Sequence, residues 1–266
     1  MKHIIKVRKQ IFPDCEEFDI AVQSPSDISS FYGVVLENDY KMLIEKIKPG
    51  DIVFDLGANI GAFTLWAAKK VGEKGRIIAV EANPRNFSVL NHNVKLNKLN
   101  NVTLYHRAIL NNNNVNIHLS GDGMLTHISE EGYAQALSIT VDGIIRETGN
   151  YPSCIKMDIE NAEIFAFESM ENSLSRLNFM IAEIHSKQAE MISTCKSTAF
   201  NKEEIHIQTN SIISIVRSHP LFFFRLELLN RFSTTSRILK RKNNLHANQY
   251  PKLIFYSRSS EPERQV

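Results

Sequence analysis

Glycines and an acidic residue stand together at a change of pattern near residue 55. Asp55 ends a short apolar run, and Gly57, Asn59 and Gly61 follow before an apolar helical pattern begins. Glycine lets the backbone come close to a ligand, and asparagine tolerates a left-handed conformation better than most residues. The amides at the start of the helix would attract a carboxylate or a phosphate. The pattern indicates either a ligand-binding turn or a tight strand-to-helix turn without a ligand.

Glu81 ends the next apolar run, 24 positions after Gly57. An acidic side chain at that place can accept hydrogen bonds from both hydroxyls of a ribose, each worth about 1.5–3 kcal/mol. The glycine turn does not match the G-x-G-x-x-G pattern of NAD-binding proteins, and it lacks the Lys-Ser/Thr of a nucleoside triphosphate loop. Glu81 and the turn together therefore favour S-adenosylmethionine as the ligand over NAD or a nucleoside triphosphate.

Apolar runs that are typical of buried strands alternate with helical patterns from residue 51 onward. The expected strands are residues 51–55, 77–80, 102–105, 154–159, 179–185, 222–228 and 252–256. Such alternation predicts an α/β fold with a mostly parallel sheet and helices on both faces, in which ligands lie at the carboxyl ends of the strands. The helix expected after Glu160 has Phe165 on its apolar face.

Four blocks of residues, in this order, resemble the FkbM-type S-adenosylmethionine-dependent methyltransferases over about residues 38–257. They are Asp55-Leu56-Gly57-Ala58-Asn59-Ile60-Gly61-Ala62-Phe63-Thr64-Leu65, Glu81-Ala82-Asn83-Pro84 with Phe87 and Leu90-Asn91-x-Asn93, Ile155-Lys156-Met157-Asp158-Ile159-Glu160-Asn161-Ala162-Glu163, and Ala182-Glu183-Ile184-His185. The resemblance implies a Rossmann-like seven-stranded methyltransferase sheet with an antiparallel C-terminal strand. It also implies methylation of hydroxyl oxygens, often on sugars of polysaccharides, glycolipids or natural products.

The resemblance also implies roles for single residues. Asp55, Gly57, Asn59 and Gly61 would face the methionine part of the cofactor, and Glu81 would face its ribose. The family's third block usually reads Asp-x-Glu-Gly, and this chain has Asn161 in place of the glycine. Asparagine can adopt many glycine conformations at a modest energetic cost.

A hydroxyl acceptor needs a base, because it is a poor nucleophile until it loses its proton. A positioned base contributes roughly 10²–10⁴-fold to the rate. Asp158 is the first candidate, Glu160 the second and His185 the third, and the choice stays open. Lys156 either pairs with a neighbouring carboxylate or binds an acceptor oxygen, whereas Glu163 is better explained by its favourable charge at a helix N-terminus.

Glu183 and His185 share one side of the fifth strand, near its end. With Asp158 they could bind the acceptor, ligate a divalent metal or form a structural hydrogen-bond network. Their spacing matches no dedicated metal motif, so we predict acceptor binding for Glu183 and no metal.

Composition narrows the class of protein. The 266 residues have a formal net charge of +2, a hydrophobic fraction of 43% and a charged fraction of 23%, which are normal for a globular domain and exclude wholesale disorder. No apolar run approaches the roughly 18 residues of a membrane span. Three scattered cysteines, with neither a CxxC pair nor a secretory signal, favour the cytoplasm. We expect an N-terminal extension over residues 1–37, the methyltransferase domain over 38–257 and a polar tail over 258–266.

The charge is unevenly distributed. Residues 1–186 contain 18 basic and 23 acidic residues, whereas residues 187–266 contain 13 and 6. We therefore expect a small-molecule or glycan acceptor that is anionic, with a pocket built from residues 115–140 and 186–250 and the basic stretch 231–248 beside it. The alternatives are an RNA methyltransferase, or a non-catalytic module that binds an anionic partner through the basic C-terminal part. Nucleic acid is the less favoured partner, because no RNA-binding motif is present.

Overall fold

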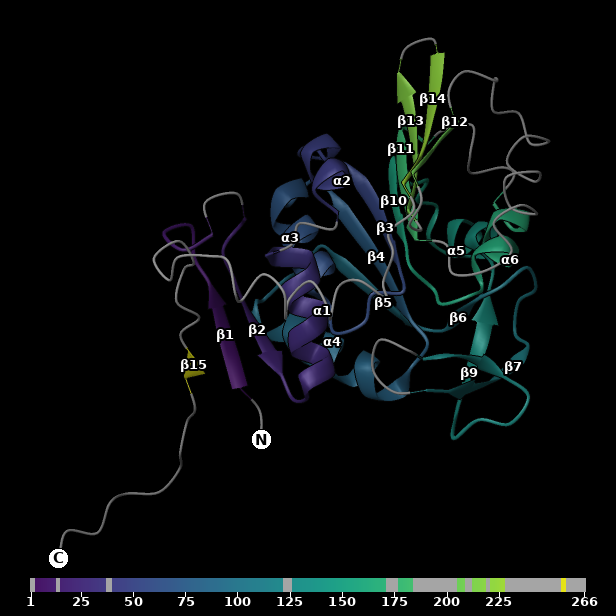
Figure 1. Cartoon of the computed structure of the whole chain (residues 1–266), viewed down its shortest axis with the longest axis horizontal. Coiled ribbons are helices and arrows are strands. Elements are labelled where there is room, and N and C mark those ends of the chain that lie inside the picture. Colours follow the sequence, from purple (N-terminus) through teal and green to yellow (C-terminus); the bar gives the residue numbers. More distant parts are fainter. Residues whose placement is uncertain are drawn as a thin grey trace, which may run out of the picture.

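The computed structural model describes part of the chain, and the fold is reported for that part. The described residues are 3–12, 15–36, 40–121, 126–170, 177–183, 205–208, 212–218, 221–227 and 255–256. Figure 1 shows their helices and strands, which form an α/β arrangement around a central sheet.

The central sheet is mostly parallel. Its strand order is β12 (Ile205–Gln208), β14 (Leu221–Glu227), β13 (Ile212–Ser218), β11 (Phe179–Glu183), β10 (Cys154–Met157), β3 (Ile52–Leu56), β4 (Arg76–Glu81) and β5 (Val102–His106). The chain leaves β3 toward β4 and β5 on one side, and it later continues from β10 to β11 on the other. The strand order therefore reverses between β3 and β10, and in such sheets the crevice at this position is where ligands bind.

The expected seven strands and antiparallel C-terminal strand differ from what is observed. Within the described residues the central sheet has eight strands, and its antiparallel member is β13, which pairs with β11 and β14. The run at 212–216, rich in β-branched residues, is a strand that the alternation pattern did not single out. The last strand in the chain, β15 (Phe255–Tyr256), pairs with β1 (His3–Val7) in a separate sheet that also contains β2 (Phe18–Val22).

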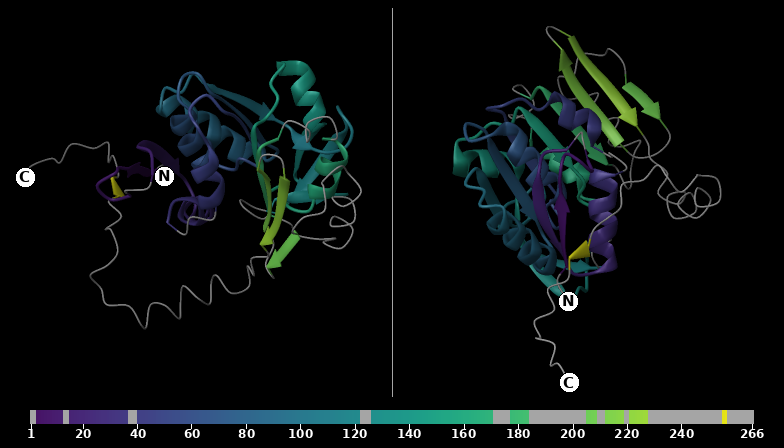
Figure 2. Two further views of the ribbon diagram at one scale, coloured as in Figure 1. Left: turned by 90° about the horizontal axis from the view of Figure 1, so that it is seen from above. Right: turned by 90° about the vertical axis from the view of Figure 1, so that its left-hand side faces the viewer.

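Helices cover both faces of the central sheet. On one face lie α1 (Pro25–Val35), α2 (Lys41–Lys46), α3 (Ala62–Val71) and α4 (Pro84–Leu96), and on the other lie α5 (Val141–Thr148) and α6 (Glu163–Glu168) (Figures 1 and 2). Two hydrophobic clusters separate the layers. Val53 and Ile77 belong to the cluster under α3, whereas their neighbours Phe54 and Ile78 belong to the cluster under α5.

This alternation decides which face carries the polar residues at the strand ends. Successive side chains of a strand point to opposite faces. Asp55 therefore lies on the same face as Val53, Glu81 on that of Ile77, and Lys156 on that of Cys154, all of which is the face under α3. A single face thus collects the charged residues at the carboxyl edge of the sheet.

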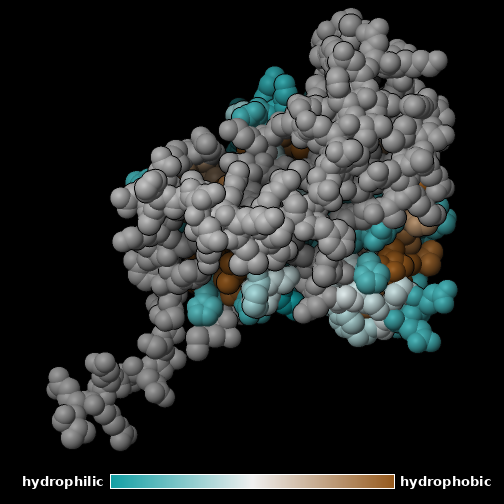
Figure 3. All heavy atoms as spheres, viewed as in Figure 1, coloured by the Kyte–Doolittle hydropathy of each residue, from teal (hydrophilic) through white to brown (hydrophobic). Residues whose placement is uncertain are grey.

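A smaller sheet lies beyond this edge. Its strand order is β6 (Ala108–Ile109), β9 (Ala134–Ile139), β7 (Asn116–Ser120) and β8 (His127–Ser129). Its inner side chains form a cluster against which Ala82, next to Glu81, packs. Figure 3 shows hydrophobic surface on this side of the molecule. In the small sheet, Ile128 and Leu137 are each 37% exposed. The small sheet therefore closes one side of the strand-end region.

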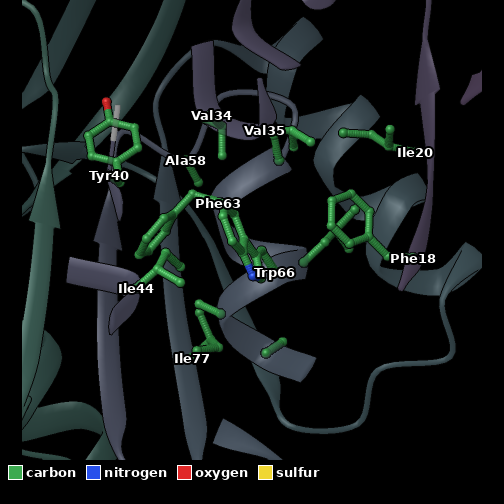
Figure 4. Close-up of a cluster of buried hydrophobic side chains, with 14 of the residues drawn as sticks. Phe18, Ile20, Val34, Val35, Tyr40, Ile44, Ala58, Phe63, Trp66 and Ile77 are labelled. Carbon is green, nitrogen blue, oxygen red and sulfur yellow. The ribbon is translucent and has the colours of Figure 1, made fainter. Parts of the chain in front are cut away.

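The N-terminal segment belongs to the same core as α3. Figure 4 shows Phe18, Ile20, Val34 and Val35 around Trp66, which is 2% exposed. Residues 3–12 and 15–36 therefore contribute apolar side chains to the core under the central sheet's helices. The expected divisions at residues 37 and 257 stay predictions.

No helix in the described ranges is long and apolar enough to cross a membrane. Cys15 and Cys154 are buried free thiols. The cytoplasmic location stays a prediction.

Asn93 of α4 and its C-cap residue Asn97 form hydrogen bonds with the backbone of β2, and Asn93 also bonds to the glycine turn. The Asn93 side chain accepts a hydrogen bond from the Ala21 amide (2.7 Å) and donates to the carbonyl oxygens of Ala21 (3.2 Å) and Ile60 (2.8 Å). One turn later, Asn97 makes the same pair of contacts with the backbone of Asp19, at 2.8 and 2.6 Å. Since Ile60 belongs to the glycine turn, Asn93 connects that turn to the N-terminal sheet.

We expect Asn93→Ala to lower the free energy of unfolding by about 3 kcal/mol, because it leaves buried backbone groups without their hydrogen-bond partners. Urea denaturation measures the change. The control is Asn91→Ala, on the same helix and half-buried, which should cost less than about 1 kcal/mol. Equal losses of unfolding free energy in the two variants would show that the side-chain hydrogen bonds of Asn93 do not stabilise the fold.

Candidate functional site

The turn between β3 and α3 has the left-handed backbone that its glycines and Asn59 predict. The φ angles are 80° at Gly57, 51° at Asn59 and 94° at Gly61. A Cβ atom on Gly57 would lie 1.8 Å from the carbonyl oxygen of Asp158, and one on Gly61 would lie 2.6 Å from Leu90. Glycine is therefore required at both positions by conformation and by close packing.

Asp55 lies beneath this turn. It is fully buried, its Oδ2 accepts a 2.5 Å hydrogen bond from the Thr64 hydroxyl, and its Oδ1 is 3.3 Å from the Lys156 Nζ. The Lys156 ammonium also donates to the carbonyl oxygen of Gly57 at 2.5 Å. Lys156 on β10 thus connects strand β3 with the turn that follows it.

Lys156 keeps its proton although its side chain is only 5% exposed. Burial alone would lower its pKa, but the nearby carboxylates of Asp55, Asp158 and Glu81 outweigh that effect and raise it. Lys156 thus contacts a carboxylate, that of Asp55, and its binding of an acceptor oxygen stays a prediction.

Glu81 lies at the end of β4, directly beside the glycine turn. Its Oε2 accepts a hydrogen bond from the Asn59 amide (2.7 Å), and its Oε1 accepts one from the Asn83 amide (2.8 Å). Burial raises the pKa of Glu81 to about 7, an effect that these two hydrogen bonds and Lys156 reduce and Asp55 increases. Each carboxylate oxygen retains acceptor capacity for a further hydrogen bond, such as one from a ribose hydroxyl.

Asn83 connects Glu81 with the small sheet. Its side-chain oxygen caps α4 by accepting from the amides of Arg85 and Asn86, and its Nδ2 donates to the hydroxyls of Thr126 (2.8 Å) and Tyr133 (3.0 Å). The position of the small sheet is therefore linked to the residue beside the predicted ribose site.

Tyr40 is a further residue of the site. Its hydroxyl donates to Asp158 Oδ2 at 3.1 Å, and its ring packs edge-on against Phe63 with centroids 5.6 Å apart. The Lys156 ammonium lies 5.3 Å from the centroid of the same ring. Figure 4 shows Tyr40 above Phe63. No local pattern signals this contact, because Tyr40 and Asp158 are 118 positions apart.

The turn after β10 has two consecutive residues with left-handed backbone. Asn161 has φ 77°, so the asparagine adopts the conformation that favours glycine in the related block. Glu160 has φ 48°, which is uncommon for a residue of its type. Such conformations persist where the surrounding structure holds them, and they are frequent at functional sites.

A first cavity opens at the carboxyl ends of β3, β4 and β10. Of the predicted residues, its walls include Gly57, Asn59, Glu81, Lys156, Asp158 and Glu160. Asp55 and Gly61 do not line it, so in this structure they support the turn from behind. Glu183, 5% exposed at the end of β11, is not on its wall either. His185 lies outside the described residues.

The rest of the first cavity comes from α1, from the residue after β5 and from the small sheet. The helix α1 contributes Ser29, Ser30 and Gly33. Arg107 follows β5, and the small sheet contributes Leu119 and residues 126–128. Part of the segment 115–140 therefore lies on this wall, and its role in acceptor binding stays a prediction. The side chains of residues 186–250 lie outside the described part of the chain.

A second cavity adjoins the first. His127, Ile128 and Glu160 line both, and these three residues form the boundary between them. The second cavity is also lined by Leu110, Asn111, Asn161 and Phe165. It therefore combines apolar walls with amide, carboxylate and imidazole groups.

The charges of the first cavity suit a ligand with positive groups. Three carboxylates line it, those of Glu81, Asp158 and Glu160, and Asp55 lies directly behind it. The cations on its wall are the Lys156 ammonium and the Arg107 guanidinium, so carboxylates outnumber them. S-adenosylmethionine has a positive sulfonium and a positive amino group besides its carboxylate, so this set of residues fits it. No group of three or more His, Cys, Asp or Glu side chains that could hold a metal is found among the described residues.

Comparisons with known proteins agree with this fit. A family model described as the methyltransferase FkbM domain matches residues 55–219. Hexuronic acid methyltransferase AglP of Haloferax volcanii is 28% identical over 171 residues, which cover 62% of this chain and 69% of that protein. A tRNA (guanine(37)-N(1))-methyltransferase of Drosophila pseudoobscura pseudoobscura is 35% identical over 63 residues, which cover 24% of this chain and 14% of that enzyme.

Solved structures of methyltransferases are also similar at low sequence identity. Aeropyrum pernix fibrillarin with natively bound S-adenosyl-L-methionine has a TM-score of 0.38 and 16% identity, covering 60% of this chain and 62% of that one. A SAM-dependent methyltransferase from Aquifex aeolicus has a TM-score of 0.41 and 14% identity, covering 73% of this chain and 97% of that one.

The raised pKa of Glu81 predicts opposite pH dependences for folding and for ligand binding. Because the carboxyl pKa rises from 4.5 to about 7 on folding, the free chain should lose up to about 3 kcal/mol of stability as pH rises through this window. A ribose hydroxyl donates to the deprotonated carboxylate, so affinity for S-adenosylhomocysteine should rise roughly tenfold from pH 6 to pH 8.

Urea denaturation and titration calorimetry measure these two trends, with Glu81→Gln as the matched variant. Both dependences should flatten in that variant, since the amide does not titrate. Wild-type binding that does not change with pH, or a pH dependence that persists in Glu81→Gln, would exclude Glu81 as the responsible group.

Proposed function

The chain belongs to the FkbM methyltransferase family, with S-adenosylmethionine as its methyl donor, and we propose that it methylates a hydroxyl oxygen of a sugar or glycan. The observation that carries this proposal is the carboxylate of Glu160 at the boundary between the cofactor cavity and the second cavity. The similarity to a hexuronic acid methyltransferase supports a sugar acceptor with an acidic group.

The proposed cofactor position follows from the first cavity. Glu81 would accept hydrogen bonds from the ribose hydroxyls, and the glycine turn at Gly57 and Asn59 would form the wall beside the methionine part. Asp55 and Gly61 act from behind this wall, by fixing Lys156 and by packing against Leu90. Asp158, held by Tyr40, contributes negative charge to the same cavity.

S-adenosylmethionine, when bound, supplies a methyl group on a positively charged sulfur that needs no further activation. The chain's own residues must therefore orient the acceptor oxygen toward that methyl and accept the hydroxyl proton. Orientation converts the transfer into an effectively unimolecular step, and the base adds roughly 10²–10⁴-fold.

Glu160 is the proposed proton acceptor. A base must reach the hydroxyl while the oxygen faces the cofactor, and Glu160 lines both cavities, whereas Asp158 lines only the first. Asp158 also accepts the Tyr40 hydroxyl and lies near the Lys156 charge. We therefore assign Asp158 to positioning and charge balance. His185 remains a third candidate from the sequence alone, and Glu183 remains a candidate acceptor residue.

Glu160→Gln should lower kcat by roughly 100-fold or more, because the amide cannot take the proton, while affinity for S-adenosylhomocysteine stays within about twofold. Steady-state kinetics and calorimetry measure the two effects. The control is Glu73→Gln, an exposed residue just after α3 that lines neither cavity and should retain wild-type turnover. A Glu160→Gln enzyme with wild-type kcat would remove this residue as the base.

The acceptor class is tested by S-adenosylhomocysteine formation with a panel of acidic glycans, neutral glycans and RNA. We expect turnover with acidic glycans, lower turnover with neutral ones and none with RNA. Turnover with RNA alone, together with binding that weakens steeply with salt, would favour the RNA alternative and overturn the sugar proposal.

A further inference from the structure

Phe165 has an aromatic ring that the hydrophobic core does not use. The sequence pattern places it on the apolar face of α6 together with Ala166, and the structure buries Ala166 but leaves Phe165 half-buried. Phe167 belongs to the cluster under α5, and Phe165 belongs to none of the clusters found in the described residues. Phe165 is therefore less buried than the pattern predicts, and it lines the second cavity.

The remaining wall of the second cavity offers hydrogen bonds of several kinds. Asn161 carries an amide that can donate and accept, and Glu160 carries a carboxylate that accepts. The Asn111 amide donates to Glu168 (2.8 Å) and accepts from Asn112 (3.2 Å), and it keeps a second N–H and a second lone pair. Asn161 has an exposed side chain, and its left-handed backbone sets it beside Glu160 at the start of α6. These groups suit a ligand with several hydroxyls.

We infer that the second cavity binds one pyranose ring of the acceptor, with the apolar C–H face of the sugar on the Phe165 ring. This inference rests on the proposed function and names its acceptor site. The face of an aromatic ring carries partial negative charge, which complements the partial positive charge of the sugar C–H groups. The sugar hydroxyls meet Asn111, Asn161 and Glu160 around its edge.

The position of the boundary residues orients this sugar. His127, Ile128 and Glu160 line both cavities, so a hydroxyl of a ring seated on Phe165 reaches the cofactor cavity past Glu160. Phe165 is therefore a specificity-determining residue, and Glu160 is the group that contacts the reacting hydroxyl. Arg107 adds a cation to the wall of the first cavity.

The test compares Phe165→Leu, which keeps an apolar side chain but removes the ring, with Phe165→Tyr, which keeps the ring. Saturation-transfer NMR measures binding of methyl β-D-glucuronide to the full chain with S-adenosylhomocysteine present. We expect the sugar C–H signals to fall at least fivefold in the Leu variant and to be retained in the Tyr variant. Affinity for S-adenosylhomocysteine and the thermal melting temperature should be unchanged in both.

Equal sugar signals in wild type and Phe165→Leu would overturn the inference. A signal that depends on Phe165 with guanosine monophosphate, and none with the sugar, would overturn it in favour of a nucleobase. The panel assay for turnover distinguishes this from failure of the proposed function. If wild type methylates a glycan and Phe165→Leu does so with unchanged KM, the sugar site is wrong while the activity stands. If no glycan is methylated, the activity itself fails.

Discussion

The site depends on the contacts that the buried Lys156 ammonium makes with Asp55 and Gly57. The ammonium lies 3.3 Å from Asp55 and 2.5 Å from the carbonyl oxygen of Gly57, so it joins β10 to β3 where the strand order reverses. Taking these charges out of water costs several kcal/mol, and only close partners repay that cost. Removing one partner would leave a buried charge uncompensated. The pair therefore fixes the glycine turn against the strand that carries Asp158.

Several residues of the cofactor cavity are positioned by the turn and the strand that Lys156 connects. The turn requires glycine at position 57 because the backbone of Asp158 leaves no room for a Cβ. The Asp158 carboxylate accepts a hydrogen bond from the Tyr40 hydroxyl, and Glu81 accepts one from the Asn59 amide of the turn. Excess negative charge results at one edge of the sheet, which favours a cofactor with positive groups. The proposed proton transfer depends on the same arrangement, because Glu160 lines both the cofactor cavity and the second cavity.

Much of this site could be predicted from local sequence. Alternation along the strands, with the spacing from Gly57 to Glu81, was enough to bring Glu81 and Asp158 to one edge, because strand parity and parallel topology are local rules. The features that could not be predicted depend on contacts between distant segments of the chain. Tyr40 and helix α1 reach the cavity only through the tertiary fold. The helical spacing predicts that Phe165 is on the apolar face of α6, but in this short helix the residue is only half-buried. The extra strand pairing of β13 is equally non-local.

The most direct test of this account is the double-mutant cycle between Lys156 and Asp55, measured by urea denaturation and by calorimetry with S-adenosylhomocysteine. Lys156→Met should cost about 3–5 kcal/mol of stability and at least a tenfold loss of affinity, because Asp55 is left charged and buried. Adding Asp55→Asn should recover more than half of the lost stability. If Lys156→Met unfolds at the wild-type urea concentration and binds S-adenosylhomocysteine as tightly as wild type, the pair does not hold the cofactor turn and the account is contradicted.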